Sequence, residues 1–374
     1  MNAKRVLLIH EDRLVGNLYR EKLEAVGLAV DSARSSDAGL KVAGERRPDL
    51  AVLDAVIPGS EITQLIAELR AHDPARPMPI VILPTFRPIL TEKAQEAGAS
   101  AILSRGPNPV ADLVDAIQNE LGLERTSLIE KGLPFCADDS WLKISLSAAP
   151  ETLTALRRTL HEMSRGTADT AAPREFFQRI HGIAEQMSLL GQKPLSNFCA
   201  AIEALAFDLV RFPEESNPSV LRTLGQSVDF LATLLGDGVR NRLEDPSAAQ
   251  VLVVDDEDGA GKIIMAAMRL AHLKSVAANT PTATLAALGV QEFDLIFLDV
   301  GLPEMNGFEL CAKIRTMPMH EKTPVVFITG MATFQNRAQS SLSGGNDFVG
   351  KPFSIPELGL KALMWVFKGQ LGLT

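Results

Sequence analysis

The segment FDLIFLDVGLPEMNG (293–307) decides the fold of the C-terminal part of this 374-residue chain. It begins with a short apolar run, typical of a strand buried on both faces of a parallel sheet, and the run ends at Asp299. Other runs of this kind alternate with segments of helical periodicity. We therefore expect strands near 250–254, 274–278, 294–298, 324–328 and 346–349.

The same pattern occurs a second time near the N-terminus, where PDLAVLDAVIPGS (48–60) corresponds to the segment above and Asp54 precedes Asp299 by 245 residues. Helical periodicity is clear in 13–26 and 109–121. The strands expected in this copy lie near 5–9, 27–32, 50–54, 79–83 and 100–103.

Short buried strands that alternate with helices predict an α/β, doubly wound, five-stranded parallel sheet in each copy. The predicted domains are 1–122 and 249–374, separated by 123–248. We interpret 123–140 and 241–248 as linkers.

The middle of the chain is helical throughout, and its helices are expected at 150–164, 173–190, 194–211 and 218–236. A proline stands near the start of each, where its missing N–H costs nothing. Four helices joined by short loops predict a four-helix bundle.

Composition excludes several classes of protein. The net charge is −9 and Lys and Arg form no stripe, which argues against nucleic-acid binding. No apolar run reaches the length of about 18 residues that a membrane span needs. Three scattered cysteines (Cys136, Cys199 and Cys311) and the lack of a signal-peptide core favour a reduced, cytoplasmic protein.

Carboxylates stand at two strand ends of the C-terminal copy. Asp255 and Asp256 follow its first strand, and Asp299 ends its third. Because neighbouring parallel strands are about 5 Å apart, the three side chains must converge. Converging like charges require a cation or protons, and hard oxygen ligands suit Mg²⁺.

Two further polar residues complete this set. Thr329 ends the fourth strand and Lys351 ends the fifth. A carboxylate nucleophile, a metal, a hydroxyl and a lysine are what phosphoryl transfer to an aspartate requires.

With these motifs, residues 249–374 resemble the receiver domain of bacterial two-component response regulators, whose fold is flavodoxin-like. The resemblance implies that Asp299 is the phosphoacceptor and that Thr329 and Lys351 contact the phosphoryl group. It further implies a Mg²⁺ site formed by Asp255, Asp256, Asp299 and the backbone carbonyl of Gly301.

Two positions in this copy bear on its behaviour. Phe348 occupies the family's switch-aromatic position and would move inward with Thr329 on phosphorylation, although it would otherwise be read as a core aromatic. Gly301 is smaller than the residue that receivers often carry there, so it should expose the site to water and alter the lifetime of the acyl phosphate.

Residues 1–122 resemble a receiver whose polar positions are eroded. His10 and Glu11 replace the acidic pair, Pro84 replaces the threonine and Arg105 the lysine, and Asp54 remains. We predict a pseudo-receiver used for dimerisation or docking. Slow phosphorylation of Asp54 is the competing hypothesis, and a transition-metal site at His10, Glu11 and Asp54 is a third.

Within the helical middle, His181 and the residues after it resemble a histidine-phosphotransfer (HPt) domain. Leu190-Gly191 and the later Cys199 and Glu203 fit that pattern, but Ala184 and Glu185 replace the family's lysine and glycine. A glutamate one turn after the histidine places negative charge where a phosphoryl group must approach. His181 is therefore either a secondary phosphoacceptor or simply an exposed or capping polar residue.

These features predict a two-component response regulator that is not an enzyme beyond autodephosphorylation. Its expected partners are a histidine kinase or phosphotransfer protein and a downstream signalling protein, with homodimerisation as a further option. The alternatives are a phosphorelay intermediate that passes phosphate between Asp299 and His181, and a scaffold that is never phosphorylated.

Overall fold

The structure is a computed structural model of the chain. It describes residues 3–57, 61–71, 77–83, 88–103, 109–123, 139–165, 171–236, 238–330 and 343–373. Three residues named above, Pro84, Arg105 and Cys136, fall outside these ranges, as does the greater part of the first linker.

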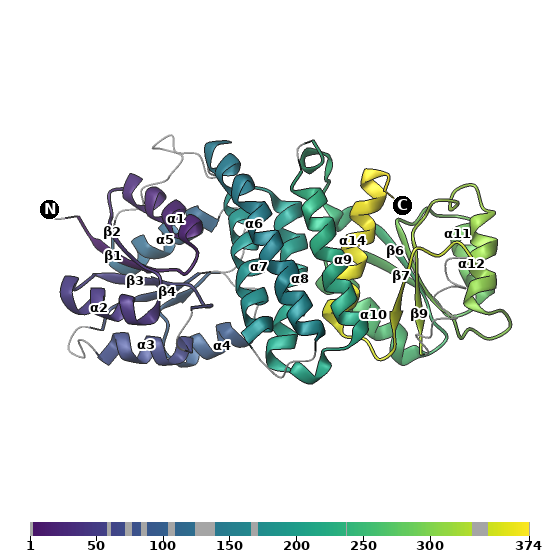
Figure 1. Cartoon of the computed structure of the whole chain (residues 1–374), viewed down its shortest axis with the longest axis horizontal. Helices are drawn as coiled ribbons and strands as arrows, with labels where there is room; N and C mark the ends of the chain where they lie inside the picture. Colours follow the sequence, from purple (N-terminus) through teal and green to yellow (C-terminus); the bar gives the residue numbers. More distant parts are fainter. Residues whose placement is uncertain are drawn as a thin grey trace. The chain divides into compact units, whose positions relative to one another are not determined.

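The chain forms two compact units. The N-terminal unit comprises Met1–Ala148 and His181–Ser196, and the C-terminal unit comprises Ala149–Ile180 and Asn197–Thr374. Figure 1 colours the chain by residue number, with the N-terminal sheet in purple and blue and the C-terminal sheet in green and yellow. Each unit contains one parallel sheet with helices on both of its faces.

The N-terminal sheet has the order β2-β1-β3-β4-β5, and all its strands are parallel. Its elements are β1 (Arg5–Ile9), α1 (Arg13–Ala25), β2 (Ala29–Ala33), α2 (Ser36–Arg46), β3 (Leu50–Leu53), α3 (Ile62–Ala71), β4 (Ile80–Ile82), α4 (Pro88–Glu96), β5 (Ala101–Ile102) and α5 (Pro109–Leu121). The apolar runs predicted as strands form this sheet. Their side chains are buried on both faces, because helices cover each face.

The C-terminal sheet has the order β10-β9-β8-β6-β7 and is also parallel throughout. Its elements are β6 (Gln250–Val254), α10 (Asp258–Leu270), β7 (Lys274–Ala278), α11 (Pro281–Leu288), β8 (Leu295–Asp299), α12 (Gly307–Arg315), β9 (Val325–Thr329), β10 (Asp347–Gly350) and α14 (Ile355–Leu371). The predicted doubly wound fold is thus confirmed at both ends of the chain.

Four long helices occupy the middle of the chain: α6 (Asp139–Ser164), α7 (Ala171–Leu189), α8 (Lys193–Arg211) and α9 (Pro218–Leu234). The second predicted linker contains two 3₁₀ turns, Arg240–Arg242 and Pro246–Ala248, and a third turn, Pro213–Glu215, precedes α9.

The prediction for the first of these helices was wrong at its start. Pro150 lies inside α6, eleven residues after its first residue, and does not begin the helix. An internal proline costs one backbone hydrogen bond, so tertiary contacts must support the turns that precede it. Trp141 provides such contacts, because its indole packs against the N-terminal core and donates a hydrogen bond of 3.1 Å to Glu21.

A glycine at the start of α12 is required by a close backbone approach that the sequence does not reveal. A Cβ atom on Gly307 would lie 2.2 Å from the carbonyl oxygen of Asp299. The amide of Gly307 donates to the carbonyl of Val300 at 3.0 Å, which holds the two segments together.

We predict that Gly307→Ala lowers the free energy of unfolding by about 2 kcal/mol or more, since neither backbone can yield. Gly261→Ala is the matched control, because Gly261 lies inside α10 with no atom within 4 Å of its added Cβ. That control should gain about 0.5–1 kcal/mol from helix propensity. Urea denaturation of the two variants tests this, and equal effects would contradict it.

Candidate functional site

The predicted carboxylates converge at the carboxyl ends of the C-terminal sheet. Val254 of β6 pairs with Leu298 of β8, so Asp255 and Asp299 come next at neighbouring strand ends. Oxygen atoms of Asp255, Asp256 and Asp299 lie within 4.8 Å of one another. Asp255 and Asp299 are buried and Asp256 is exposed, so the cluster has one side open to solvent.

Lys351 lies directly against this cluster. Its Nζ atom donates to Asp255 Oδ2 at 3.0 Å and to Asp299 Oδ2 at 3.3 Å. Its backbone amide donates to the carbonyl of Thr329 at 2.7 Å, which fixes the lysine at the end of β9. The lysine ammonium group is therefore within hydrogen-bonding distance of both carboxylates and can neutralise negative charge on either.

The pKa values of these groups are shifted by their surroundings. Burial raises the pKa of Asp255, and the neighbouring charge of Asp299 adds to that effect. Burial opposes the charged form of Lys351, but its hydrogen bond to Asp255 and the charge of Asp299 outweigh it and raise its pKa. Lys351 is thus a permanent cation at neutral pH and compensates charge that the aspartates carry.

Thr329 and Gly301 flank Asp299. Thr329 is the buried last residue of β9, the strand next to Asp299. A Cβ on Gly301 would lie 3.7 Å from Asp299 Oδ2. The absence of a side chain at this exposed glycine leaves space directly beside the carboxylate.

Phe348 lies on β10, the edge strand of the sheet, and is half-buried. The guanidinium carbon of Arg222, a residue of α9, lies 3.9 Å from the centre of its ring. Arg222 and Phe348 belong to the same compact unit. The ring that the family resemblance identifies as a switch therefore contacts a helix from the middle of the chain.

The N-terminal copy has an equivalent site built from other residues. Ile9 pairs with Leu53, so His10 and Asp54 follow at neighbouring strand ends. The backbone amide of Asp12 donates to His10 Nδ1 at 3.1 Å, as that of Glu257 donates to Asp255 Oδ1 at 2.8 Å. His10 thus accepts the same backbone hydrogen bond that the first aspartate of the acidic pair accepts in the C-terminal copy.

Two side chains of α7 enter this N-terminal site, and both belong to the same unit. His10 Nε2 lies 2.8 Å from Glu185 Oε2, and His181 Nε2 lies 3.3 Å from Asp54 Oδ1. All four side chains are at most 4% exposed. The expectation that His181 is exposed or capping was therefore wrong, because it is buried against an acidic partner.

The acidic residue beside His10 and Asp54 differs from the one predicted from the sequence. Glu185, and not the predicted Glu11, has an oxygen close enough to His10 and Asp54 to share a cation with them. His10 Nε2 carries a hydrogen both in the neutral ring that accepts at Nδ1 and in the charged ring. The contact of 2.8 Å with Glu185 is therefore a hydrogen bond between a donor and a carboxylate.

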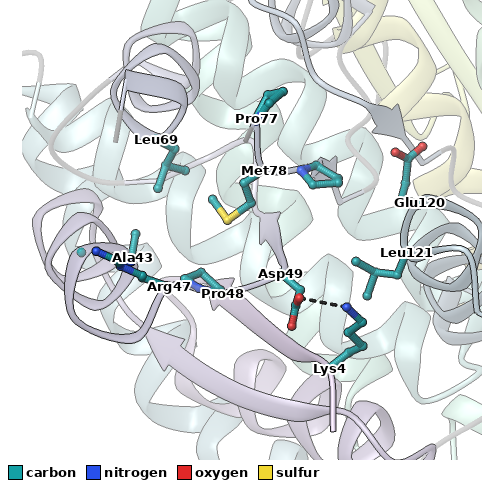
Figure 2. A pocket seen from close by; sticks show the side chains of 12 residues that line it. Lys4, Ala43, Arg47, Pro48, Asp49, Leu69, Pro77, Met78, Glu120 and Leu121 are labelled. Atoms are coloured by element: carbon teal, nitrogen blue, oxygen red, sulfur yellow. Dashed lines mark hydrogen bonds and ion pairs between the residues drawn. The ribbon is translucent and has the colours of Figure 1, made fainter. Parts of the chain in front are cut away.

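A surface hollow in the N-terminal unit lies at the other end of the sheet (Figure 2). Lys4 precedes β1 and Asp49 precedes β3, and the two form an ion pair of 3.1 Å across it. Its lining includes Arg47, Pro77 and Met78. Because the chemistry of a parallel sheet lies at the carboxyl ends of its strands, this hollow is separate from the site at Asp54.

A buried ion pair on α14 was not predicted. Lys361 is fully buried and donates to Asp347 and to Gln226 of α9, while Trp365 donates to Asp347 at 3.2 Å. Burial lowers the pKa of Lys361, and Asp347 counteracts that effect. A lysine within the apolar segment LGLKALMWVF (358–367) was the only available signal.

The family described as "Response regulator receiver domain" matches residues 6–118 and 251–362, together more than half of the chain. A probable transcriptional regulatory protein, TcrX of Mycobacterium tuberculosis, is 34% identical over 125 residues, which are 33% of this chain and 53% of that protein.

Two further similar proteins are named response regulators. Response regulator PleD of Caulobacter vibrioides is 37% identical over 107 residues, 28% of this chain and 23% of that protein. The structure of chemotaxis response regulator CheY4 of Vibrio cholerae, at 28% identity, covers 32% of this chain and 98% of its own, with a TM-score of 0.30. The chain thus spans about half or less of the curated relatives that it matches.

Within the described residues, no helix is both long enough and apolar enough to cross a membrane.

We predict that Asp347→Ala lowers the free energy of unfolding by about 3 kcal/mol or more, because it leaves Lys361 buried without its carboxylate. Asp229→Ala is the control, since Asp229 pairs with Arg157 at an exposed site and should change stability by less than about 1 kcal/mol. Chemical denaturation followed by circular dichroism measures both. Similar losses in the two variants would show that the buried pair has no special importance.

Proposed function

Since this chain belongs to the response regulator receiver family, with a receiver domain at each end, we propose that Asp299 accepts a phosphoryl group from a histidine kinase or a phosphotransfer protein. The observation that supports this most directly is the convergence of Asp255, Asp256 and Lys351 on Asp299. The proposed output is an interaction with a downstream signalling protein, with no enzymatic activity beyond autodephosphorylation.

In the proposed step, a carboxylate oxygen of Asp299 attacks the phosphorus of a phosphohistidine. The new O–P bond forms as the N–P bond breaks, and the donor imidazole leaves with its electron pair and takes a proton. Lys351, which bridges Asp299 and Asp255 at 3.3 and 3.0 Å, is placed to turn toward the incoming phosphoryl oxygens. Thr329 would donate its hydroxyl to one of them.

The donor set fits a hard divalent cation, because three carboxylates meet and one side of the cluster is open. Asp255, Asp256, Asp299 and the backbone carbonyl of Gly301 would hold Mg²⁺, which supplies positive charge to the phosphoryl oxygens. Because Gly301 has no side chain, the space beside Asp299 would admit the water that later hydrolyses the acyl phosphate.

The surroundings of His181 and Asp299 bear on the phosphorelay and scaffold hypotheses. His181 is buried against Asp54 and Glu185 within the N-terminal unit, which disfavours a relay between Asp299 and His181. The scaffold hypothesis needs only the fold, and the contact of the carboxylates with Lys351 argues against it. We therefore retain phosphorylation at Asp299 as the proposed function.

We predict that incubation with acetyl phosphate and Mg²⁺ labels Asp299, and that Asp299→Asn or removal of Mg²⁺ abolishes that label. Asp294→Asn is the matched control, since this exposed aspartate precedes the same strand. Borohydride trapping and mass mapping measure the label. Absence of label at Asp299 in the unaltered chain would favour the scaffold hypothesis.

The contact of Phe348 with Arg222 suggests how the signal leaves the receiver. On the same face, Glu357 of α14 accepts hydrogen bonds from Ser219 at 2.8 Å and Thr223 at 3.0 Å, both on α9. Movement of Phe348 on phosphorylation would change the contact with Arg222 and so reach α9 before any external partner.

We predict that Arg222→Ala leaves the labelling of Asp299 intact but reduces the change in hydrogen exchange of α9 that labelling causes. Arg211→Ala is the control, because Arg211 stacks on its own neighbour Phe212 away from the receiver switch. Exchange of residues 218–234 would be followed by mass spectrometry with and without acetyl phosphate. An undiminished response in Arg222→Ala would contradict this route.

A further inference from the structure

The two residues that depart most from their family patterns contact each other. His10 stands where a receiver has an acidic residue, and Glu185 stands where an HPt helix has a glycine. In the N-terminal unit the two side chains form a buried hydrogen bond of 2.8 Å. His10 replaces a carboxylate of the receiver pattern, and Glu185 adds negative charge where the HPt pattern keeps space for a phosphoryl group. Together the two residues form a complementary donor and acceptor pair.

We propose that the face of α7 formed by His181, Gly182, Glu185 and Gln186 is the resident occupant of the N-terminal receiver site, docked in cis so that Asp54 is closed to phosphodonors. This inference goes beyond the function proposed for Asp299 and does not depend on it. The occupant of the N-terminal site is a segment of the same chain, and this contact binds the two parts without phosphoryl transfer.

The spacing of His181 and Asp54 supports binding without transfer. For transfer, the attacking nitrogen must lie about 3–3.5 Å from phosphorus, which itself is bonded to the aspartate oxygen. His181 Nε2 is already 3.3 Å from Asp54 Oδ1, so the two atoms are at hydrogen-bond distance. A phosphoryl group cannot be placed between them unless the helix moves away.

The interface places two histidines against two carboxylates. Burial opposes protonation of His10, whereas the negative charges of Glu185 and Asp54 favour it. Burial likewise opposes ionisation of Asp54, but His181 and His10 outweigh it and lower the pKa of Asp54. The two histidines thus contact Glu185 and Asp54 at the place where an active receiver has a lysine and a metal.

The remaining contacts show close packing over the same site. Gln186 Nε2 donates to Asp12 Oδ2 at 2.9 Å, while Asp12 Oδ1 caps α1 through the amides of Leu14 and Val15. A Cβ on Gly182 would lie 2.7 Å from Asp12 Oδ2. Because Asp12 is held from both sides, α7 can approach this closely only with a glycine at position 182.

The first test is a double-mutant cycle in the full-length chain with His10→Gln, Glu185→Gln and the double variant. Hydrogen exchange of 10–16 and 181–189 reports docking. Each single change should reduce protection by about tenfold or more, since it leaves a buried polar partner unpaired. The double variant should lose less than the product of the two single effects. Glu175→Gln, at a half-buried pair with Arg179 on the same helix, should leave the protection of 10–16 unchanged.

Gly182→Ala provides a second test, because an undocked α7 and a docked α7 predict opposite changes in hydrogen-exchange protection. An alanine inside an isolated helix is more favourable than a glycine, which predicts more protection of 181–189. The docked arrangement predicts less protection of both segments, because the added methyl meets Asp12.

Independent effects of His10 and Glu185 in the cycle, or increased protection in Gly182→Ala, would overturn the inference. Acyl-phosphate label on Asp54 in the unaltered chain, at a rate like that of Asp299, would also overturn it. Failure of labelling at Asp299 concerns only the C-terminal site, so the two proposals fail in different experiments.

Discussion

The parallel register of the first and third strands in each sheet is the constraint on which both sites depend. In one sheet Val254 pairs with Leu298, and in the other Ile9 pairs with Leu53. Whatever residues follow these pairs must share a small space at the carboxyl edge. In this chain acidic residues follow in three of the four places, so each site needs positive charge from elsewhere.

The two units meet this need in different ways. In the C-terminal unit, Lys351 contacts both buried aspartates, and one side of the cluster stays open for a cation and a phosphoryl group. In the N-terminal unit, His10 and His181 contact the carboxylates of Glu185 and Asp54, and all four groups are buried. An open cluster suits chemistry, whereas a closed and paired cluster suits a lasting interface.

Helices from the middle of the chain take part in both arrangements. The second half of α7 contributes His181 and Glu185 to the N-terminal unit, and α9 contributes Arg222, Ser219 and Thr223 to the C-terminal unit. Side chains from the helical region thus contact the strand-end residues of both receiver domains. In the proposed scheme, a change at Phe348 reaches α9 first, and a change at Asp54 first requires α7 to leave.

By itself, the sequence determined the two doubly wound sheets and the convergence of Asp255, Asp256, Asp299 and Lys351. The physical reason is that strand-length apolar runs specify buried parallel strands, and such strands bring their ends together. Only the tertiary structure decided that His181 is buried, that Glu185 pairs with His10, that Pro150 lies within α6 and that Lys361 is paired inside the protein. These outcomes depend on contacts between residues far apart in the chain, and local periodicity carries no information about which distant charge will complete a site.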